Sequence, residues 1–185
     1  VQNNTIIRRN TADQGGGIYN DGKLTVTGSR LEQNKAARLG GGINNSTTGT
    51  LDMSLSTLQF NETTLISGIE TTGGAGLYNA GTATITTSTF DQNLAFSFGG
   101  GIYNDNSLTI TRSTLSGNVA DKSARSSRGG GIFNNNTALI VQTTMFANQA
   151  SAGGGFSTGN SGSSTLRNVS IAVNEAYGAF DNNFN

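Results

Sequence analysis

A five-residue phrase that recurs along the whole chain constrains the fold of this 185-residue sequence more than any other feature. It combines glycines, an apolar residue, a Tyr, Phe or Asn, and a final Asn. The copies are Gly16-Gly17-Ile18-Tyr19-Asn20, Gly41-Gly42-Ile43-Asn44-Asn45, Ala75-Gly76-Leu77-Tyr78-Asn79, Gly100-Gly101-Ile102-Tyr103-Asn104 and Gly130-Gly131-Ile132-Phe133-Asn134, with weaker ones at Gly154-Gly155-Phe156 and Gly178-Ala179-Phe180-Asp181-Asn182. Their apolar residues lie 25, 34, 25, 30, 24 and 24 positions apart. A basic period of 24–25 residues indicates a solenoid.

A second phrase, apolar-x-x-Asn, alternates with the first along the chain. Its seven asparagines are Asn10, Asn34, Asn61, Asn93, Asn118, Asn148 and Asn174. Between the two phrases lie alternating segments such as Ala83-Thr84-Ile85-Thr86 and Leu108-Thr109-Ile110-Thr111. Alternation with a period of two, rich in β-branched residues and bounded by Gly and Asn, predicts short strands rather than helices.

These patterns predict one domain, residues 1–185, folded as an all-β, right-handed parallel β-helix of about seven coils. Each coil is expected to hold about three strands. The coils are expected to stack, because a single repeat cannot bury its apolar residues without a neighbour. Right-handed winding is expected because parallel crossover connections take that hand. Two intervals exceed the basic period, which predicts insertion loops near residues 62–73 and 119–128.

Stacked coils turn each repeated position into a column of like residues. We expect the seven phrase-ending asparagines to form a structural ladder, because stacked amides hydrogen-bond to one another and to turn backbone. The sequence has no Pro, which fits coils that must all donate N–H groups to their neighbours. These residues are therefore expected to build the fold rather than to bind a ligand.

The composition excludes much chemistry. The chain has no Cys and no His, so thiolate sites, cysteine nucleophiles and Ser-His-Asp triads are impossible. Lys plus Arg balances Asp plus Glu at 11 each, which gives no electrostatic basis for binding nucleic acid. No apolar run approaches the ~20 residues of a membrane span. We therefore expect no enzyme activity, no cofactor and no obligatory metal.

The phrases resemble the right-handed β-helix repeats of bacterial surface proteins, above all the passengers of polymorphic outer membrane proteins. Those passengers repeat Gly-Gly-Ala-(Ile/Leu/Val) and Phe-x-x-Asn, and this chain has Gly73-Gly74-Ala75-Gly76-Leu77 and Phe90-Asp91-Gln92-Asn93. The resemblance implies secretion, extracellular or cell-surface display and adhesion. The chain has no segment resembling the outer-membrane barrel of that family.

The two ends of the sequence hold complementary parts of one coil, and neither shows a capping element. If one copy followed another, Phe180 would lie 12 positions before the next Ile7, against 13–15 for the same step within the chain. This near-match in spacing predicts a secreted structural protein that self-assembles head-to-tail into a filament. The residues expected at the contact are Val1, Gln2, Asn3, Asn4, Thr5, Ile7, Ala179, Phe180, Asn182, Phe184 and Asn185.

Two alternatives stay open. The chain could be a rod-like fragment of a cell-surface adhesin, or a polysaccharide-binding or polysaccharide-degrading β-helix. A possible surface aromatic stripe of Tyr19, Tyr78, Tyr103 and Phe133 follows the first-phrase apolar residues. It could bind glycans or a host cell surface, or it could pack against a second rod or the insertion loops.

Overall fold

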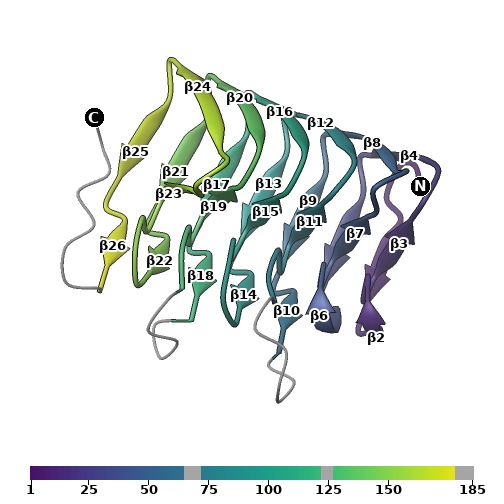
Figure 1. Ribbon diagram of the computed structural model, residues 1–185. Helices are drawn as coiled ribbons and strands as arrows, with labels where there is room; N and C mark the ends of the chain where they lie inside the picture. Colours follow the sequence, from purple (N-terminus) through teal and green to yellow (C-terminus); the bar gives the residue numbers. More distant parts are fainter. Residues whose placement is uncertain (65–71, 122–126, 178–185) are drawn as a thin grey trace.

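Each repeat folds into four short strands, most of them three to five residues long. The strands are short because turns rich in Gly and Asn interrupt the extended chain. The computed structural model describes residues 1–64, 72–121 and 127–177, and the described part contains no helix. Its strands stack into four parallel sheets, two of six strands and two of seven, so the molecule is a parallel β-solenoid of about six turns. In Figure 1 the turns lie side by side along one axis, from the first coil (purple) to the last (yellow).

Following the chain around one coil, we number the sheets 1 to 4. Sheet 1 contains β3 (Ile18–Asn20), β7 (Ile43–Asn45), β11 (Leu77–Asn79), β15 (Ile102–Asn104), β19 (Ile132–Asn134) and β23 (Phe156–Thr158). Sheet 2 contains β4 (Lys23–Thr27), β8 (Thr50–Ser54), β12 (Thr82–Thr86), β16 (Ser107–Thr111), β20 (Thr137–Val141) and β24 (Ser163–Arg167).

Sheets 3 and 4 complete each coil. Sheet 3 contains β1 (Ile6–Arg8), β5 (Arg30–Glu32), β9 (Thr57–Gln59), β13 (Thr89–Asp91), β17 (Thr114–Ser116), β21 (Thr144–Phe146) and β25 (Ser170–Ala172). Sheet 4 contains β2 (Thr11–Gln14), β6 (Lys35–Leu39), β10 (Glu62–Thr63), β14 (Leu94–Ala95), β18 (Val119–Ala120), β22 (Gln149–Ala150) and β26 (Glu175–Ala176).

The strand register confirms the predicted columns. The first-phrase apolar residues pair in one column: Ile18 with Ile43, Ile43 with Leu77, Leu77 with Ile102, Ile102 with Ile132 and Ile132 with Phe156. The second-phrase residues pair likewise, from Ile7 and Leu31 to Met145 and Ile171. The inward side chains of sheets 1, 2 and 3 form one continuous apolar core along the axis.

Glycine in the first phrase lets adjacent coils approach closely at the turn into sheet 1. A Cβ atom on Gly76 would lie 2.5 Å from the carbonyl oxygen of Gly101 in the next coil. Because that distance is far below van der Waals contact, a larger residue there would push the coils apart. The repeated Gly therefore fixes the spacing of the stack at this turn.

Two sequence-based expectations need correction. Each coil has four strands rather than about three, and the added strands form sheet 4. Their inward residues are mostly small, as at Ala36, Ala95 and Ala120, so they give little hydrophobic alternation. The insertions are also shorter than predicted, because Glu62–Thr63 and Val119–Ala120 are strands and Gly73 and Arg128 form β-bridges. The about six turns of the structure roughly match the predicted count of about seven, and the last phrase copy, 178–182, lies outside the described residues.

Candidate assembly surfaces

The seven predicted ladder asparagines lie in one column, each hydrogen-bonded to the next. The side-chain amide of each Asn donates from Nδ2 to the Oδ1 of the Asn one coil later. The Nδ2–Oδ1 distances are 3.0 Å for Asn10–Asn34, 3.1 Å for Asn34–Asn61, 3.0 Å for Asn61–Asn93, 2.9 Å for Asn93–Asn118, 2.9 Å for Asn118–Asn148 and 2.9 Å for Asn148–Asn174. The middle members are fully buried, so the ladder runs inside the turn between sheets 3 and 4.

Asn93 shows how completely a buried ladder member is satisfied. Its Nδ2 donates to Asn118 Oδ1 and, at 2.9 Å, to the carbonyl oxygen of Leu58. Its Oδ1 accepts from both the backbone N–H and the Nδ2 of Asn61, each at 3.0 Å. The side chain thus makes four hydrogen bonds, one of which satisfies a turn N–H that would otherwise be buried without a partner.

A second Asn ladder, which was not predicted, lies between sheets 1 and 2. It consists of the last residue of the first phrase, with Nδ2–Oδ1 distances of 2.7 Å for Asn20–Asn45, 2.7 Å for Asn45–Asn79, 2.8 Å for Asn79–Asn104 and 2.7 Å for Asn104–Asn134. The ladder then ends, because Asn134 Nδ2 donates to the hydroxyl of Ser164 and the next residue in the strand register is Thr158. The Asn that ends each copy of the first phrase was the sequence signal that could have predicted this second ladder.

The terminal coils expose side chains whose counterparts in middle coils are buried. Leu166 and Ile171, on β24 and β25, are 37% and 36% exposed. Their register partners Ile140 and Met145, one coil earlier, are both 0% exposed. At the other end, core residues such as Ile7 are only partly buried. The apolar columns of the core therefore extend to both outer faces of the described solenoid.

The predicted contact residues at the start of the chain already belong to the stack. Gln2 forms a β-bridge with Thr27, and the backbone N–H of Asn3 donates to the Thr27 carbonyl at 2.9 Å. The terminal amine of Val1 donates to Thr25, and the N–H of Arg30 to Thr5. Residues 1–5 thus run beside Thr25–Arg30, and together with Ile7 they form part of the outer face. The other predicted contact residues, Ala179, Phe180, Asn182, Phe184 and Asn185, lie outside the described residues.

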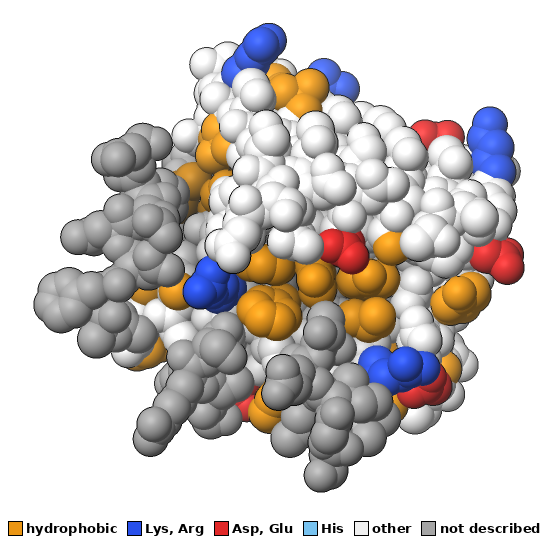
Figure 2. Space-filling model, in the orientation of Figure 1, with side chains coloured by type: hydrophobic (Ala, Val, Ile, Leu, Met, Phe, Trp, Pro, Cys, Tyr) orange, Lys and Arg blue, Asp and Glu red, His pale blue; other side chains and the backbone are white. Residues whose placement is uncertain are grey.

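The aromatic stripe is not a surface stripe along its length, and this expectation was wrong. Tyr19 is 54% exposed, but Tyr103 and Phe133 are 7% and 6% exposed. Phe98, from the turn before sheet 1, stacks on Phe133 at a centroid distance of 4.8 Å and meets Tyr103 edge-on at 5.9 Å. Tyr78 also meets Tyr103 edge-on, at 5.2 Å. Hydrophobic side chains accordingly gather across the middle of the face that carries sheet 1 (Figure 2).

Burial changes the acidity of this aromatic cluster. Desolvation, reinforced by the nearby Asp105 carboxylate, raises the pKa of Tyr103 to about 12. The pKa of Tyr78 is raised for the same reasons, and its hydroxyl donates to Asp105 Oδ2 at 3.2 Å. Asn135 Nδ2 donates to the other oxygen of Asp105 at 2.8 Å. Both tyrosines are therefore neutral structural residues at physiological pH.

Charged side chains pair across coils rather than cluster around a reaction centre. Lys35 Nζ lies 3.2 Å from Glu62 Oε1, and Arg38 pairs with Asp13. The Arg38 guanidinium lowers the pKa of Asp13 through that hydrogen-bonded contact. Within the described part of the chain, no group of three or more Asp and Glu residues could hold a metal ion.

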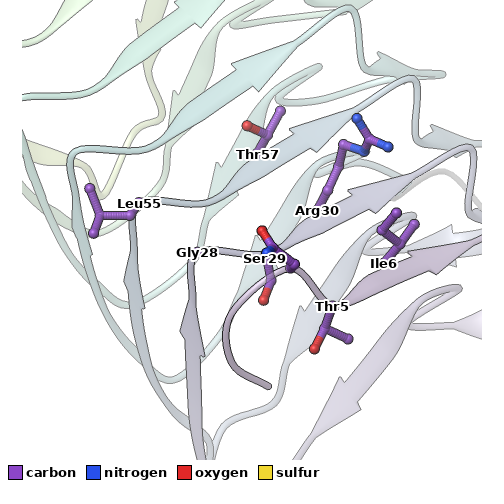
Figure 3. Close-up of a pocket in the computed structure, with 8 residues that line it drawn as sticks. Thr5, Ile6, Gly28, Ser29, Arg30, Leu55 and Thr57 are labelled. Carbon is purple, nitrogen blue, oxygen red and sulfur yellow. The ribbon is translucent and has the colours of Figure 1, made fainter.

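A hollow lies at the corner between sheets 2 and 3 of the first coils. It is lined by Asn4, Thr5, Ile6, Gly28, Ser29, Arg30, Leu55 and Thr57. Gly28 leaves the corner open where Leu55, in the next coil, has a side chain (Figure 3). Its one charged group, Arg30, is held 2.9 Å from Glu32, so the hollow has no acid-base pair aimed into it.

No helix in residues 1–64, 72–121 and 127–177 has the length and apolar character that crossing a bilayer requires. No family model, curated protein or solved structure matches the chain.

Proposed function

We propose that this chain is a secreted structural protein whose coils stack end to end with those of other copies, building an extracellular β-solenoid filament. The exposed core columns carry the proposal. Leu166 and Ile171 continue columns that are fully buried one coil earlier, so the outer face is an unfinished core rather than an ordinary surface. Covering such a face removes apolar side chains from water, which favours association by about 25 cal/mol per Å².

The backbone at these faces supports the same proposal. Among the described strands, β23, β24, β25 and β26 pair only with the preceding coil. Each offers a row of N–H and C=O groups on its other edge, and such edges template the addition of further strands. A coil presenting the same columns in the same order would pair with these edges and continue the core.

A catalytic role has less support. The acidic side chains with resolved partners pair with Arg, Lys, Tyr, Ser, Asn or Gln, mostly in neighbouring coils, as Glu62 does with Lys35. The hollow near Gly28 lacks the two facing carboxylates that glycoside hydrolysis uses. The polysaccharide-degrading alternative therefore has less support than the structural role.

The place of action rests on the resemblance to polymorphic outer membrane protein passengers, which implies display outside the cell. Fractionation of cells that express the natural gene tests this part of the proposal. We expect the protein in the medium or on the cell surface. Recovery in the cytosol alone would contradict the extracellular assignment.

Sedimentation velocity over a dilution series, followed by negative-stain microscopy, tests the assembly itself. We expect species larger than a monomer that grow with concentration, and unbranched rods of one solenoid's width. A chain that stays monomeric up to about millimolar concentration would contradict the filament.

A further inference from the structure

We infer that the Asn ladder of Asn10 to Asn174 makes this association polar: the donors of Asn174 in one copy meet the Oδ1 of Asn10 in a second copy. The inference rests on the proposed assembly and names the residues that set its direction. Only head-to-tail contact places a donor against an acceptor at this position.

Every link of the ladder has the same direction. The donor always belongs to the earlier coil and the acceptor to the later one, for the backbone N–H as well as for Nδ2. Asn118, for example, donates its N–H at 3.0 Å and its Nδ2 at 2.9 Å to Oδ1 of Asn148. At this column, each coil therefore directs the Asn Oδ1 toward the start of the solenoid and the Asn N–H and one Nδ2 hydrogen toward its far face. The other Nδ2 hydrogen turns back to a carbonyl of the earlier coil, as from Asn118 to Phe90 at 2.9 Å.

The serine column at the corner between sheets 2 and 3 has the same direction. The backbone N–H of Ser29 donates to Ser56 Oγ at 3.1 Å, and that of Ser88 donates to Ser113 Oγ at 3.2 Å. Again the N–H of the earlier coil meets the side-chain oxygen of the later one. Two independent side-chain columns thus give the stack one polarity.

The last described ladder member shows one donor left over at the far face, its backbone N–H. No acceptor among the described residues meets the N–H of Asn174, although the equivalent N–H of Asn148 donates to Asn174 Oδ1 at 2.9 Å. The Nδ2 of Asn174 turns back to the Ala172 carbonyl of its own coil, at 3.0 Å. In Asn148 the corresponding hydrogen goes to the next Asn.

The first ladder member shows the complementary acceptor. Asn10 is exposed, and no donor within the described residues meets its Oδ1. Its N–H and Nδ2 both donate to Asn34 Oδ1, at 3.1 and 3.0 Å. A coil in front of Asn10 would supply an N–H and an Nδ2 to this oxygen. Asn174 offers its unbonded N–H and, on release from the Ala172 carbonyl, one Nδ2 hydrogen.

The reversed arrangements lack this match. At the Asn column, two far faces in contact would oppose donors to donors, and two front faces would oppose acceptors to acceptors, leaving buried polar groups unsatisfied. Front-to-front contact would also juxtapose like charge, because residues 1–38 contain six Lys or Arg and three Asp or Glu. Asn134 ends the second ladder one coil earlier, so the first ladder is the one that reaches both faces.

Single cysteines report the polarity directly, since the natural chain has none. The Ile6→Cys and Ser170→Cys variants place a thiol on the outward column of sheet 3, in the first and last described coils. Neighbouring parallel strands lie about 4.8 Å apart, within the Cα–Cα range of a disulfide. Thr144→Cys, one coil before Ser170 in the same column, is the matched control.

Oxidation of a 1:1 mixture of Ile6→Cys and Ser170→Cys under assembling conditions is expected to give mainly the mixed disulfide, which links position 6 of one copy to position 170 of another. A size tag on one variant distinguishes this product from the homodisulfides. Each variant alone, and Thr144→Cys mixed with either, is expected to remain largely uncrosslinked. Homodisulfides of Ile6→Cys or of Ser170→Cys, or assembly without the mixed product, would overturn the inference. Sedimentation of the same samples reports assembly separately, so a failure to assemble is recognised as a failure of the proposed function instead.

Asn174→Asp tests the ladder residue, because the carboxylate keeps the acceptors for Asn148 but removes the Nδ2 donors. We expect the concentration needed for assembly to rise at least tenfold, with the circular dichroism of the fold retained. Asn160→Asp, with the same charge change at an exposed turn of the same coil, is the control and should assemble like the natural chain. Unchanged assembly of Asn174→Asp would also overturn the inference.

Discussion

The middle and last coils of this solenoid are built from the same columns but differ in what covers them. Ile110 and Ile140 on sheet 2 are fully buried, whereas Leu166, next in their column, is 37% exposed. The backbone hardly distinguishes these coils, because each contributes one strand to every sheet. The difference teaches that burial here comes from the neighbouring coil rather than from the coil itself, as expected for a repeat protein. Equivalent substitutions in the two regions should therefore have unequal effects.

The largest inequality is expected in the Asn ladder. Asn93→Ala removes four hydrogen bonds and leaves the N–H and Nδ2 of Asn61 without their acceptor. We expect the free energy of unfolding to fall by about 4 kcal/mol, since each buried unsatisfied group costs about 1–3 kcal/mol. Asn174→Ala, in the partly exposed last coil, should cost about half as much.

Urea denaturation followed by circular dichroism, at a concentration below assembly, measures both ladder variants. Equal losses for Asn93→Ala and Asn174→Ala would contradict the dependence on neighbouring coils. Ser164→Ala offers a comparison in the second ladder, because it removes only the hydroxyl that accepts from Asn134. Its loss should be about 1 kcal/mol.

The next largest loss of stability is expected in the apolar column of sheet 2. Ile140→Ala leaves a cavity in the closed core and should cost about 3 kcal/mol. Leu166→Ala should cost about 1 kcal/mol in the monomer, because Leu166 is already partly in water. The same denaturation measurement tests the pair. In assembled samples the cost of Leu166→Ala should rise toward that of Ile140→Ala, and a cost unaffected by concentration would break this part of the account.

The two tyrosines of the middle coils, Tyr78 and Tyr103, should make the stability of the fold depend on pH. Because burial raises the pKa of Tyr78 and Tyr103 above the unfolded value of about 10, the folded state holds both protons more tightly. The stabilisation is complete below pH 10 and is lost as the pH rises toward 12, by up to about 1.4 kcal/mol per pH unit for each tyrosine. The melting temperature should therefore fall over this range.

Tyr103→Phe should flatten the alkaline fall in melting temperature, because the ring packing is kept and the ionisable hydroxyl is removed. Tyr19→Phe, at a 54% exposed position in the first described coil, is the control and should leave the fall unchanged. If both variants behaved like the natural chain, the aromatic cluster would not be the source of the alkaline sensitivity.

The smallest expected difference concerns strained corner residues. Thr87 in a middle coil and Val173 in the last coil have positive φ values of 47° and 56°, which β-branched residues rarely adopt. Glycine relieves a left-handed strain of about 1–2 kcal/mol but loses up to about 1 kcal/mol in chain entropy. We expect Thr87→Gly to stabilise the fold by about 0.5–1 kcal/mol, and Val173→Gly by less because the last coil relaxes more freely. A lower melting temperature for Thr87→Gly would contradict this.

The fold was predictable because its signals repeat at fixed spacing, and each copy of a phrase occupies the same place in a coil. Ile43 and Ile102, for example, lie in one column whatever the length of the insertion between them. Sheet 4 was missed because residues such as Ala95 and Ala120 fill a narrow position where small side chains suffice. Short strands with small inward residues leave almost no pattern.

The burial of Tyr103 and Phe133 was not predictable from alternation alone. Alternation correctly places them opposite the core residues of sheet 1, but Phe98 covers them from a β-bridge position whose residue type changes from coil to coil, as Gly73 and Arg128 show. Because this position does not keep one residue type, its contribution cannot be predicted from the repeat. The second Asn ladder, in contrast, could have been predicted from the first phrase.

Hydrogen exchange across the assembly transition tests most directly the claim that the terminal coils associate through their open faces. On raising the concentration, amides in residues 163–176 and in residues 1–14 should become protected by at least about tenfold, while those in residues 82–116 should not change. This pattern would show the end coils acquiring the neighbours that middle coils already have. Assembly accompanied by unchanged exchange in both end regions, or by new protection in residues 82–116, would contradict the account.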